Sequence, residues 1–240
     1  MFPYDDAIST AVRHPSQSIS DVLQTMRIVD NACVATDGLK WFNWLYFRVT
    51  QAVEERINSG GFTDPQWLSL LDVQFANFYF NALKTALAGS PAPGCWQALF
   101  SVRRDANITR LQFALAGMNA HINHDLCQAI VSTCRATHMT PQHGTAQYND
   151  YTMLNSTLDS LIDTAKQTLD VRLPGTQLPP ISHLQDLAAG WDISAAREKA
   201  WINAEALWNL PPALALSLLD SINGFTAVIS KSLLVPVPAI

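Results

Sequence analysis

The chain has 240 residues, of which 48% are hydrophobic and 15% are Asp, Glu, Lys or Arg, and its formal net charge is −5. This length and apolar content are enough for one large hydrophobic core, so we expect a single domain. No basic cluster supplies the usual electrostatic support for binding phosphate backbones, so we expect no nucleic-acid partner. The charged fraction is below the usual share of about 25%, which favours extensive buried surface, a homodimer interface or a hydrophobic ligand.

The N-terminal sequence predicts neither a secretory signal nor a membrane anchor. It carries early acidic residues, and no stretch of the chain reaches about 18 uninterrupted apolar residues. We therefore expect a soluble, cytoplasmic protein with no membrane span. The four cysteines form no CxxC pair, and Cys127 and Cys134 are too far apart for a bridge within one straight helix, so reduced thiols are expected.

Taken in order, the chain predicts helices separated by loops. Residues 1–17 are expected to form an irregular arm, since Pro3, His14 and Pro15 interrupt any helical period. Residues 18–235 are expected to form one helical domain, in which 171–180, rich in Pro and Gly, is the strongest candidate for an internal linker. The expected helices are 18–33, 39–58, 65–88, 96–102, 110–136, 148–171, a short one from 181, 192–209 and 212–234.

No period-two alternation with β-branched enrichment persists anywhere in the chain, so strands are not expected. The predicted fold is therefore all-α, a single-domain bundle of about seven to nine helices around a buried central helix.

The segment 110–136 is the predicted central helix, because apolar residues cover most of its circumference. With about 100° per residue, Asp125 lies about 40° to one side of His121 and His124 about 60° to the other. These ionisable residues form one narrow stripe that we expect to face the interior, where each needs a partner. Gly117 is costly inside a helix and predicts close approach by a ligand or another backbone.

Three interpretations of this cluster stay open. His121, His124 and Asp125 could ligate Zn, Fe or Mn together with an acid from another helix, for which Asp37 is a candidate. Without a metal, the same residues together with Asp72 could form an acid–base catalytic centre. The third interpretation is a structural network of buried hydrogen bonds. The H-E-x-x-H pattern of zinc proteases and the E-x-x-H pair of di-iron bundles are both absent.

Residues outside the central helix are candidates for the walls and mouth of a pocket. Asp72 lies in an otherwise apolar phase of its helix, which favours a role in the site. Asp150 and the loop residue His143 are weaker candidates. The residues expected to contact a substrate are Asn119, Trp41, Tyr79 and Asn155.

Four segments carry a resemblance to a known family, and the most distinctive of them is GMNAHINHDL at 117–126. The others are DGLKWFNWLYFRVT, LDVQFANFYFNAL and DYTMLN. Together they resemble a widespread family of helical proteins known only as a domain of unknown function, over most of residues 20–225. The resemblance brings no established activity, but it implies a setting in natural-product pathways and hence a tailoring enzyme.

The leading hypothesis from the sequence is an enzyme with a buried His/His/Asp centre in an apolar pocket, acting on a hydrophobic small molecule by cyclisation, isomerisation or hydrolysis. A divalent metal or metal-free acid–base catalysis would supply the chemistry. The alternatives are a non-catalytic binding module for an apolar ligand and an interaction protein whose low charge reflects an oligomer interface.

Overall fold

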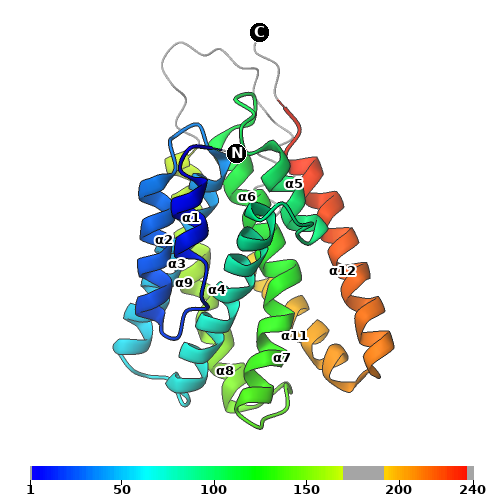
Figure 1. Ribbon diagram of the computed structural model, residues 1–240. Helices are drawn as coiled ribbons and strands as arrows, with labels where there is room; N and C mark the ends of the chain where they lie inside the picture. The colour runs from blue at the N-terminus through cyan, green and yellow to red at the C-terminus, as the bar shows by residue number, and fades with distance from the viewer. Residues whose placement is uncertain (1, 170–191, 237–240) are drawn as a thin grey trace.

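The computed structural model describes residues 2–169 and 192–236, and Figure 1 shows them as an assembly of helices. These residues contain no strand, which confirms the predicted all-α class. The candidate linker 171–180 and the short helix expected from residue 181 lie outside the described residues. The helices are α1 (Asp5–Ala11), α2 (Ile19–Ala32), α3 (Gly38–Asn58), α4 (Pro65–Leu87), α5 (Gly94–Val102), α6 (Arg110–Ala120), η1 (His121–Asp125), α7 (Leu126–Ala136), α8 (Ala146–Met153), α9 (Asn155–Leu169), α11 (Ile193–Asn209) and α12 (Pro212–Leu233).

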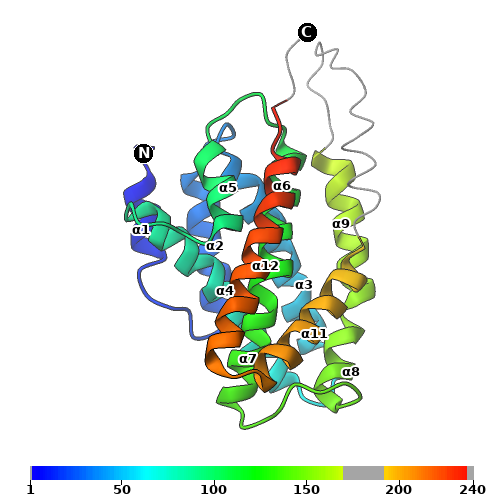
Figure 2. The same ribbon diagram turned by 90° about the vertical axis from the view of Figure 1, so that its right-hand side faces the viewer.

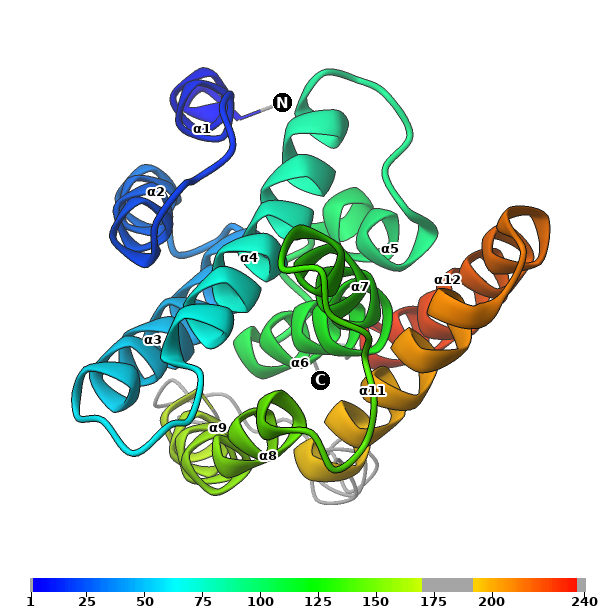
Figure 3. The same cartoon turned by 90° about the horizontal axis from the view of Figure 1, so that it is seen from below.

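A central rod made of α6, η1 and α7 organises the bundle, as predicted. Viewed along the bundle in Figure 3, α6 and α7 lie in the middle, with α3, α4, α5, α8, α9, α11 and α12 around them. Every residue from Gln112 to Ala120 is buried, so the helix is enclosed on all sides over this stretch. This burial explains why apolar residues cover most of the circumference of this helix, since only a helix packed on all sides can bury such a surface.

Side-chain caps fix where the main helices begin. Asp64 accepts a hydrogen bond from the amide of Trp67 and is followed by Pro65 at the first helical position, so the start predicted for this helix at residue 65 is confirmed. Thr109 and Gln112 form a reciprocal capping box at the start of α6.

Two glycines set the packing of α3 on α6. A Cβ atom at Gly117 would overlap the ring of Phe42, and a Cβ at Gly38 would overlap the ring of Phe113. Since residue 38 faces 113 and residue 42 faces 117, the two helices run parallel with matching four-residue steps. A close approach at Gly117 is confirmed, but it is made by the aromatic side chain of Phe42 and not by a ligand or another backbone as predicted.

The central rod is not a uniform α-helix. Residues His121–Asp125 form one turn of π-helix, in which the amide of Leu126 donates to the carbonyl of His121, five residues back. A π-turn inserts an extra residue into the helical repeat and often accompanies a functional site. The angles predicted from a constant 100° per residue are therefore wrong across this turn.

Two more elements differ from the sequence prediction. The N-terminal arm is not irregular throughout, because residues Asp5–Ala11 form α1, whose Ile8 is buried in the core. The helix expected over 148–171 is interrupted at Leu154, which separates α8 from α9. Counting the central rod as one helix, the described part of the chain has ten helices, slightly more than the seven to nine expected.

Helix α12 lies along the outside of the central rod, on the side that faces the viewer in Figure 2. It is apolar but largely exposed, with Leu214, Leu216, Phe225 and Val228 among its uncovered side chains. By length and composition alone it is a candidate for crossing a membrane, and 17% of its most apolar window is buried. Such a helix is weak evidence in either direction, so the absence of a membrane span stays a prediction.

Candidate functional site

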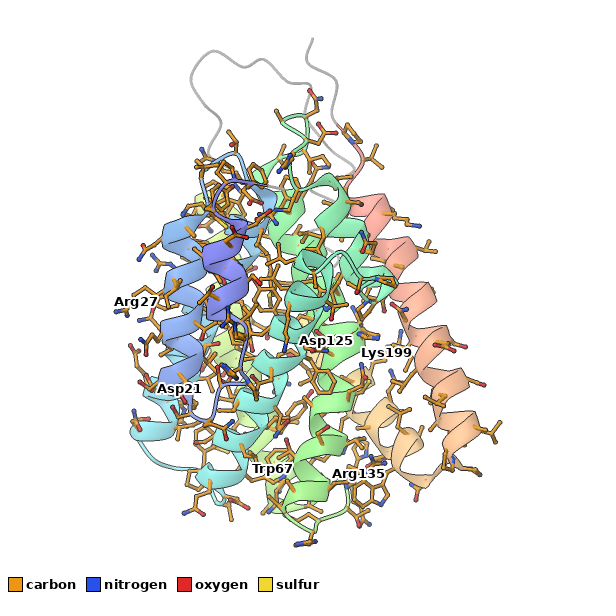
Figure 4. The ribbon with its side chains drawn as sticks, viewed as in Figure 1. Asp21, Arg27, Trp67, Asp125, Arg135 and Lys199 are labelled. Atoms are coloured by element: carbon orange, nitrogen blue, oxygen red, sulfur yellow. The ribbon has the colours of Figure 1, made fainter. Side chains whose placement is uncertain are left out.

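The carboxylate of Asp125 is the hub of the predicted His/His/Asp cluster. Its Oδ2 lies 2.9 Å from His121 Nδ1, and its Oδ1 lies 2.7 Å from His124 Nδ1. A third donor comes from α5, where Trp96 Nε1 donates to Oδ2 at 2.9 Å. Because an ionised carboxylate can only accept hydrogen bonds, both Nδ1 atoms carry protons in this arrangement. Figure 4 places Asp125 on the central rod, inside the bundle.

These contacts set the charge of the dyad formed by His121 and Asp125. Burial lowers the pKa of His121, although the neighbouring Asp125 opposes the effect. Burial alone would raise the pKa of Asp125, but the hydrogen bonds from His121 and His124 outweigh it and leave this pKa below its ordinary value. At neutral pH the dyad is therefore a neutral imidazole beside an ionised carboxylate, and His121 Nε2 carries a free lone pair.

Aromatic rings enclose His121. Its ring stacks on Phe75 with centroids 3.5 Å apart and an interplanar angle of 4°, and the ring of Tyr46 approaches edge-on at 4.4 Å. The cage is completed by Phe42, Tyr79 and Trp96. His121 is fully buried, and its Nε2 has no hydrogen-bond partner among the described residues. A buried nitrogen without a partner is costly, so its position calls for a functional explanation.

A cavity of about 50 Å³ lies next to this cage, between α3, α4, the central rod, α9 and α11. Most of its lining is aliphatic, and the polar groups on its wall belong to Tyr46, Asp72 and Arg197. Tyr46 and Phe75 contact both the cavity and the imidazole, so the dyad lies directly behind this wall. A volume of this size holds a few water molecules or a short apolar chain.

Asp72 lies at the cavity, as its apolar helical phase predicts. It is 8% exposed, and its Oδ2 has no hydrogen-bond partner in the described part of the chain. Burial raises the pKa of Asp72 to about 7, with a further increase from the charge of Glu54 and an opposing effect from Arg197. A carboxyl group with this pKa can both accept and release a proton at neutral pH.

Arg197 on α11 is a site residue that the sequence analysis missed. Its Nε donates to Asn155 Oδ1 at 2.7 Å, and its Nη2 donates to the carbonyl of Tyr151 at 2.8 Å. The guanidinium also lies 3.9 Å from the centroid of the Tyr151 ring. The available signal was its helical phase, since Arg197 shares a face with the buried residues Ile193, Trp201 and Ala204.

The residues predicted to bind substrate have different surroundings. Tyr79 belongs to the aromatic cage, and Asn155 reaches the cavity only through its hydrogen bond to Arg197. Asn119 instead ties α6 to α12, because its Nδ2 donates to the Thr226 carbonyl and to Ser230 Oγ. Trp41 donates to the carbonyl of Ala35 and stacks under Arg110, away from the cavity lining.

The structure does not bring Asp37 to the histidines. Its carboxylate pairs with Arg103, accepts a hydrogen bond from Tyr4 and caps α3. Asp37 precedes Tyr46 by nine residues, which is about 13 Å along a helix, whereas Tyr46 is the residue that touches His121. The sequence-based placement of Asp37 beside the cluster is therefore not supported.

The two weaker candidates also have other partners. Asp150 accepts hydrogen bonds from the amides of Thr63 and Asp64, so it holds the loop before α4. His143 lies on the surface between Glu198 and Glu205, at 2.7 and 2.6 Å.

The donor set constrains how a metal ion could bind. Both oxygens of Asp125 already accept hydrogen bonds from the histidines. In this arrangement the remaining ligand atoms are the Nε2 atoms of His121 and His124 and one acceptor site of Asp125 Oδ1, whereas a zinc site needs four donors. The described residues contain no group of three or more His, Cys, Asp or Glu poised to hold a metal. The metal site stays a prediction.

Comparisons with known proteins identify a family but no activity. No curated protein and no solved structure matches the chain. One family model matches residues 19–236, which is most of the sequence and includes every residue of the cage and cavity. The chain therefore belongs to the family of unknown function DUF5995.

Proposed function

We propose that this protein is a metal-free acid–base enzyme that acts on a small apolar molecule bound in the cavity beside Asp72. One observation carries the proposal. Two polar atoms on either side of the cavity wall, Asp72 Oδ2 and His121 Nε2, are buried without a hydrogen-bond partner among the described residues, whereas the hydroxyl of Tyr46 between them interacts with that of Thr50. Because folding gains nothing from leaving such atoms unpaired, they support a role with a ligand.

The three groups have complementary protonation states. Asp72, with a pKa of about 7, can deliver or remove a proton. Tyr46 stays protonated, because burial first and then the charge of Asp72 raise its pKa well above the ordinary value. His121 is held neutral with Nδ1 on Asp125, so Nε2 is the atom that accepts a proton.

This set is suited to reactions that only relocate protons. In an isomerisation, one group removes a proton from a carbon of the substrate while another delivers a proton elsewhere, so the double bond moves and no further reagent is used. A cyclisation started by protonating an alkene and ended by losing a proton has the same balance. Tailoring of a hydrophobic natural product is the setting we propose for such a step, with hydrolysis as the remaining alternative.

Access to His121 requires a change in the cavity wall. The cavity of about 50 Å³ is much smaller than typical ligand pockets of about 300–1,000 Å³. The substrate is therefore small, or α9 and α11 move apart to admit it. Because Phe75 lies flat on the imidazole and lines the cavity, rotation of its side chain is the simplest movement that would uncover Nε2.

A binding protein without catalysis is the alternative that the same cavity supports. An apolar cavity with a single buried cation would hold a ligand without any need for Asp72 or His121 to change protonation. The unpaired atoms of these two residues favour the enzyme.

Deuterium exchange tests the enzyme against this alternative. The protein is incubated in D₂O with a panel of small unsaturated apolar acids, esters and ketones, and nuclear magnetic resonance follows C–H exchange or double-bond migration. We expect turnover with the parent and its loss in Asp72→Asn and His121→Gln, with helical circular dichroism unchanged. His143→Gln is the matched surface control. Ligands that bind without any exchange would identify a binding protein instead.

A further inference from the structure

Two buried arginines of this chain have opposite surroundings. Arg103 pairs with the carboxylates of Asp37 and Asp5, so its charge is balanced inside the protein. Arg197 is equally buried, at 6% exposure, yet it takes part in none of the ion pairs of the described residues, and the charges of Asp159 and Asp72 act on it without direct contact. Burying a cation without a carboxylate partner is costly. The positive charge of Arg197 therefore lacks the ion-paired carboxylate that balances the charge of Arg103.

Only two of the three nitrogen atoms in the Arg197 guanidinium donate hydrogen bonds to described residues. Its two hydrogen-bond acceptors are neutral, namely an amide oxygen of Asn155 and the backbone carbonyl of Tyr151. These bonds engage Nε and Nη2, and they fix the plane of the group. Nη1 has no hydrogen-bond partner in the part of the chain that the structure describes, and the residue lines the cavity.

We infer that the ligand of this cavity is a small apolar carboxylic acid, whose carboxylate pairs with Arg197 while its hydrocarbon part lies against α3, α4 and the central rod. The lining supports both halves of this description. The side chains that face the tail are aliphatic or aromatic, among them Val49, Leu68, Leu71 and Ile122. Arg197 is the single basic residue among the described residues that line the cavity.

The number of donors favours a carboxylate over a phosphate. A phosphate group brings up to two charges and three oxygens, which the cavity could meet only with one cation, Arg197, and with the hydroxyl of Tyr46 and protonated Asp72 as further donors. A carboxylate has one charge and two oxygens, and it leaves fewer unpaired atoms in an apolar enclosure. Protonated Asp72 could donate a hydrogen bond to the second oxygen.

This inference rests on the proposed site and names the class of its substrate. It also implies how a substrate would be oriented. With its carboxylate held at Arg197, the adjacent carbons of the ligand would lie within the cavity that Asp72 and Tyr46 also line.

Calorimetric titration with matched ligand pairs tests the inference. The probes are the carboxylates from butanoate to decanoate and the primary amides of the same chain lengths, which differ in charge but little in size. At pH 6 we expect at least one carboxylate to bind about tenfold or more tightly than its amide, as hydrogen bonds to charged groups imply. Equal affinities, or no binding by any carboxylate of the series, would overturn the inference.

Variants separate a charge effect from a loss of folding. Arg197→Gln keeps a donor for the Tyr151 carbonyl and should bind the acid and the amide alike, with circular dichroism unchanged. Arg48→Gln is the control, since Arg48 is exposed and lies on Trp44. If Arg197→Gln unfolds the protein, the parent's preference for acid over amide still decides the matter.

The binding data are independent of turnover. Preference for carboxylates without deuterium exchange would support this inference and refute the proposed enzyme. Exchange on neutral ligands that is unchanged in Arg197→Gln would support the enzyme and refute the inference.

Discussion

Tyr46 lies against His121, with ring centroids 4.4 Å apart, because α3 and α6 pack in parallel register. The register is set one and two turns earlier, where Phe42 fills the space left by Gly117 and Phe113 fills the space left by Gly38. Each step is four residues on both helices, so the next step brings residue 46 to residue 121. The two glycines therefore help to position the site, Gly117 through Phe42, which also contacts His121.

The first prediction concerns Gly117→Ala. Alanine normally stabilises a helix by about 1 kcal/mol relative to glycine, but here its Cβ would overlap the ring of Phe42. Forcing extra volume into a packed core costs about 1–3 kcal/mol, so we expect net destabilisation in urea unfolding. The variant should also disturb the contact between Tyr46 and His121 and lower any activity.

Gly224→Ala is the matched control for this substitution. Gly224 also lies within a helix, α12, but a Cβ there meets nothing within 4 Å. We expect this variant to be stabilised by about 0.5–1 kcal/mol. If Gly117→Ala gained stability in the same way, the packing of α3 on α6 described above would be wrong.

The second prediction concerns the stability of Asp72→Asn. A carboxyl whose pKa is raised on folding contributes stability that is complete below the unfolded pKa, near 4, and lost as pH rises through the folded pKa, about 7. The parent therefore loses up to about 4 kcal/mol between these pH values, and the neutral amide does not. We expect Asp72→Asn to unfold at higher urea concentration than the parent, with a larger gain at pH 8 than at pH 5.

Asp125→Asn should behave in the opposite way. The carboxylate of Asp125 accepts hydrogen bonds from His121, His124 and Trp96, and an amide at this position would set its NH₂ group against one of these donors. We expect a loss of stability at pH 7 of about 3–5 kcal/mol.

For Asp72→Asn, a gain in stability together with a loss of function would mark Asp72 as a residue kept for its chemistry. If Asp72→Asn instead lost stability at pH 8, this result would contradict the raised pKa of Asp72.

These residues show what the sequence could and could not predict. The apolar circumference of 110–136 predicted the buried central helix, and the apolar phase of Asp72 predicted its burial, because both depend on local periodicity alone. The π-turn at His121–Asp125 could not be predicted from a constant helical repeat. The hydrogen bonds of a π-turn join residues five positions apart in the sequence, and no residue type specifies such a turn.

Partners from distant segments were harder to predict than helices. Asp37 is buried and acidic, as a metal ligand would be, but its partner is Arg103 from the end of α5. Trp96 donates to Asp125 across the core, and Arg197 reaches the cavity from α11. Periodicity gives the face of a helix on which a residue lies, whereas these pairings depend on which faces meet.

The third prediction concerns metal content. Ligation of a metal by Asp125 would take its oxygens away from two histidine N–H groups and leave buried donors unpaired. We therefore expect tag-free protein purified without chelator to contain no stoichiometric zinc, iron or manganese by plasma mass spectrometry. A full equivalent in the parent and in His143→Ala, absent from His121→Ala and Asp125→Ala, would contradict the metal-free mechanism and restore the metal interpretation of the cluster.

The fourth prediction concerns the pH dependence of carboxylate binding. Below pH 7 Asp72 is protonated, so the charge of Arg197 is available to a ligand carboxylate. Above pH 7 the Asp72 anion joins Asp159 in balancing Arg197 and repels the ligand, and Glu54 adds negative charge near Asp72. Tyr46 and His121 are both neutral across this range, because burial raises the pKa of the first and lowers that of the second.

Affinity for the carboxylate should therefore fall as pH rises from 6 to 8, while affinity for the matching amide stays level. Calorimetry in buffers of different ionisation enthalpy should show proton uptake on binding near pH 7, since the bound anion favours the protonated form of Asp72. In Asp72→Asn both the fall and the proton uptake should disappear, with binding at pH 8 as tight as at pH 6. A fall that persists in this variant would mean that another group titrates, and it would separate Asp72 from the binding of the ligand.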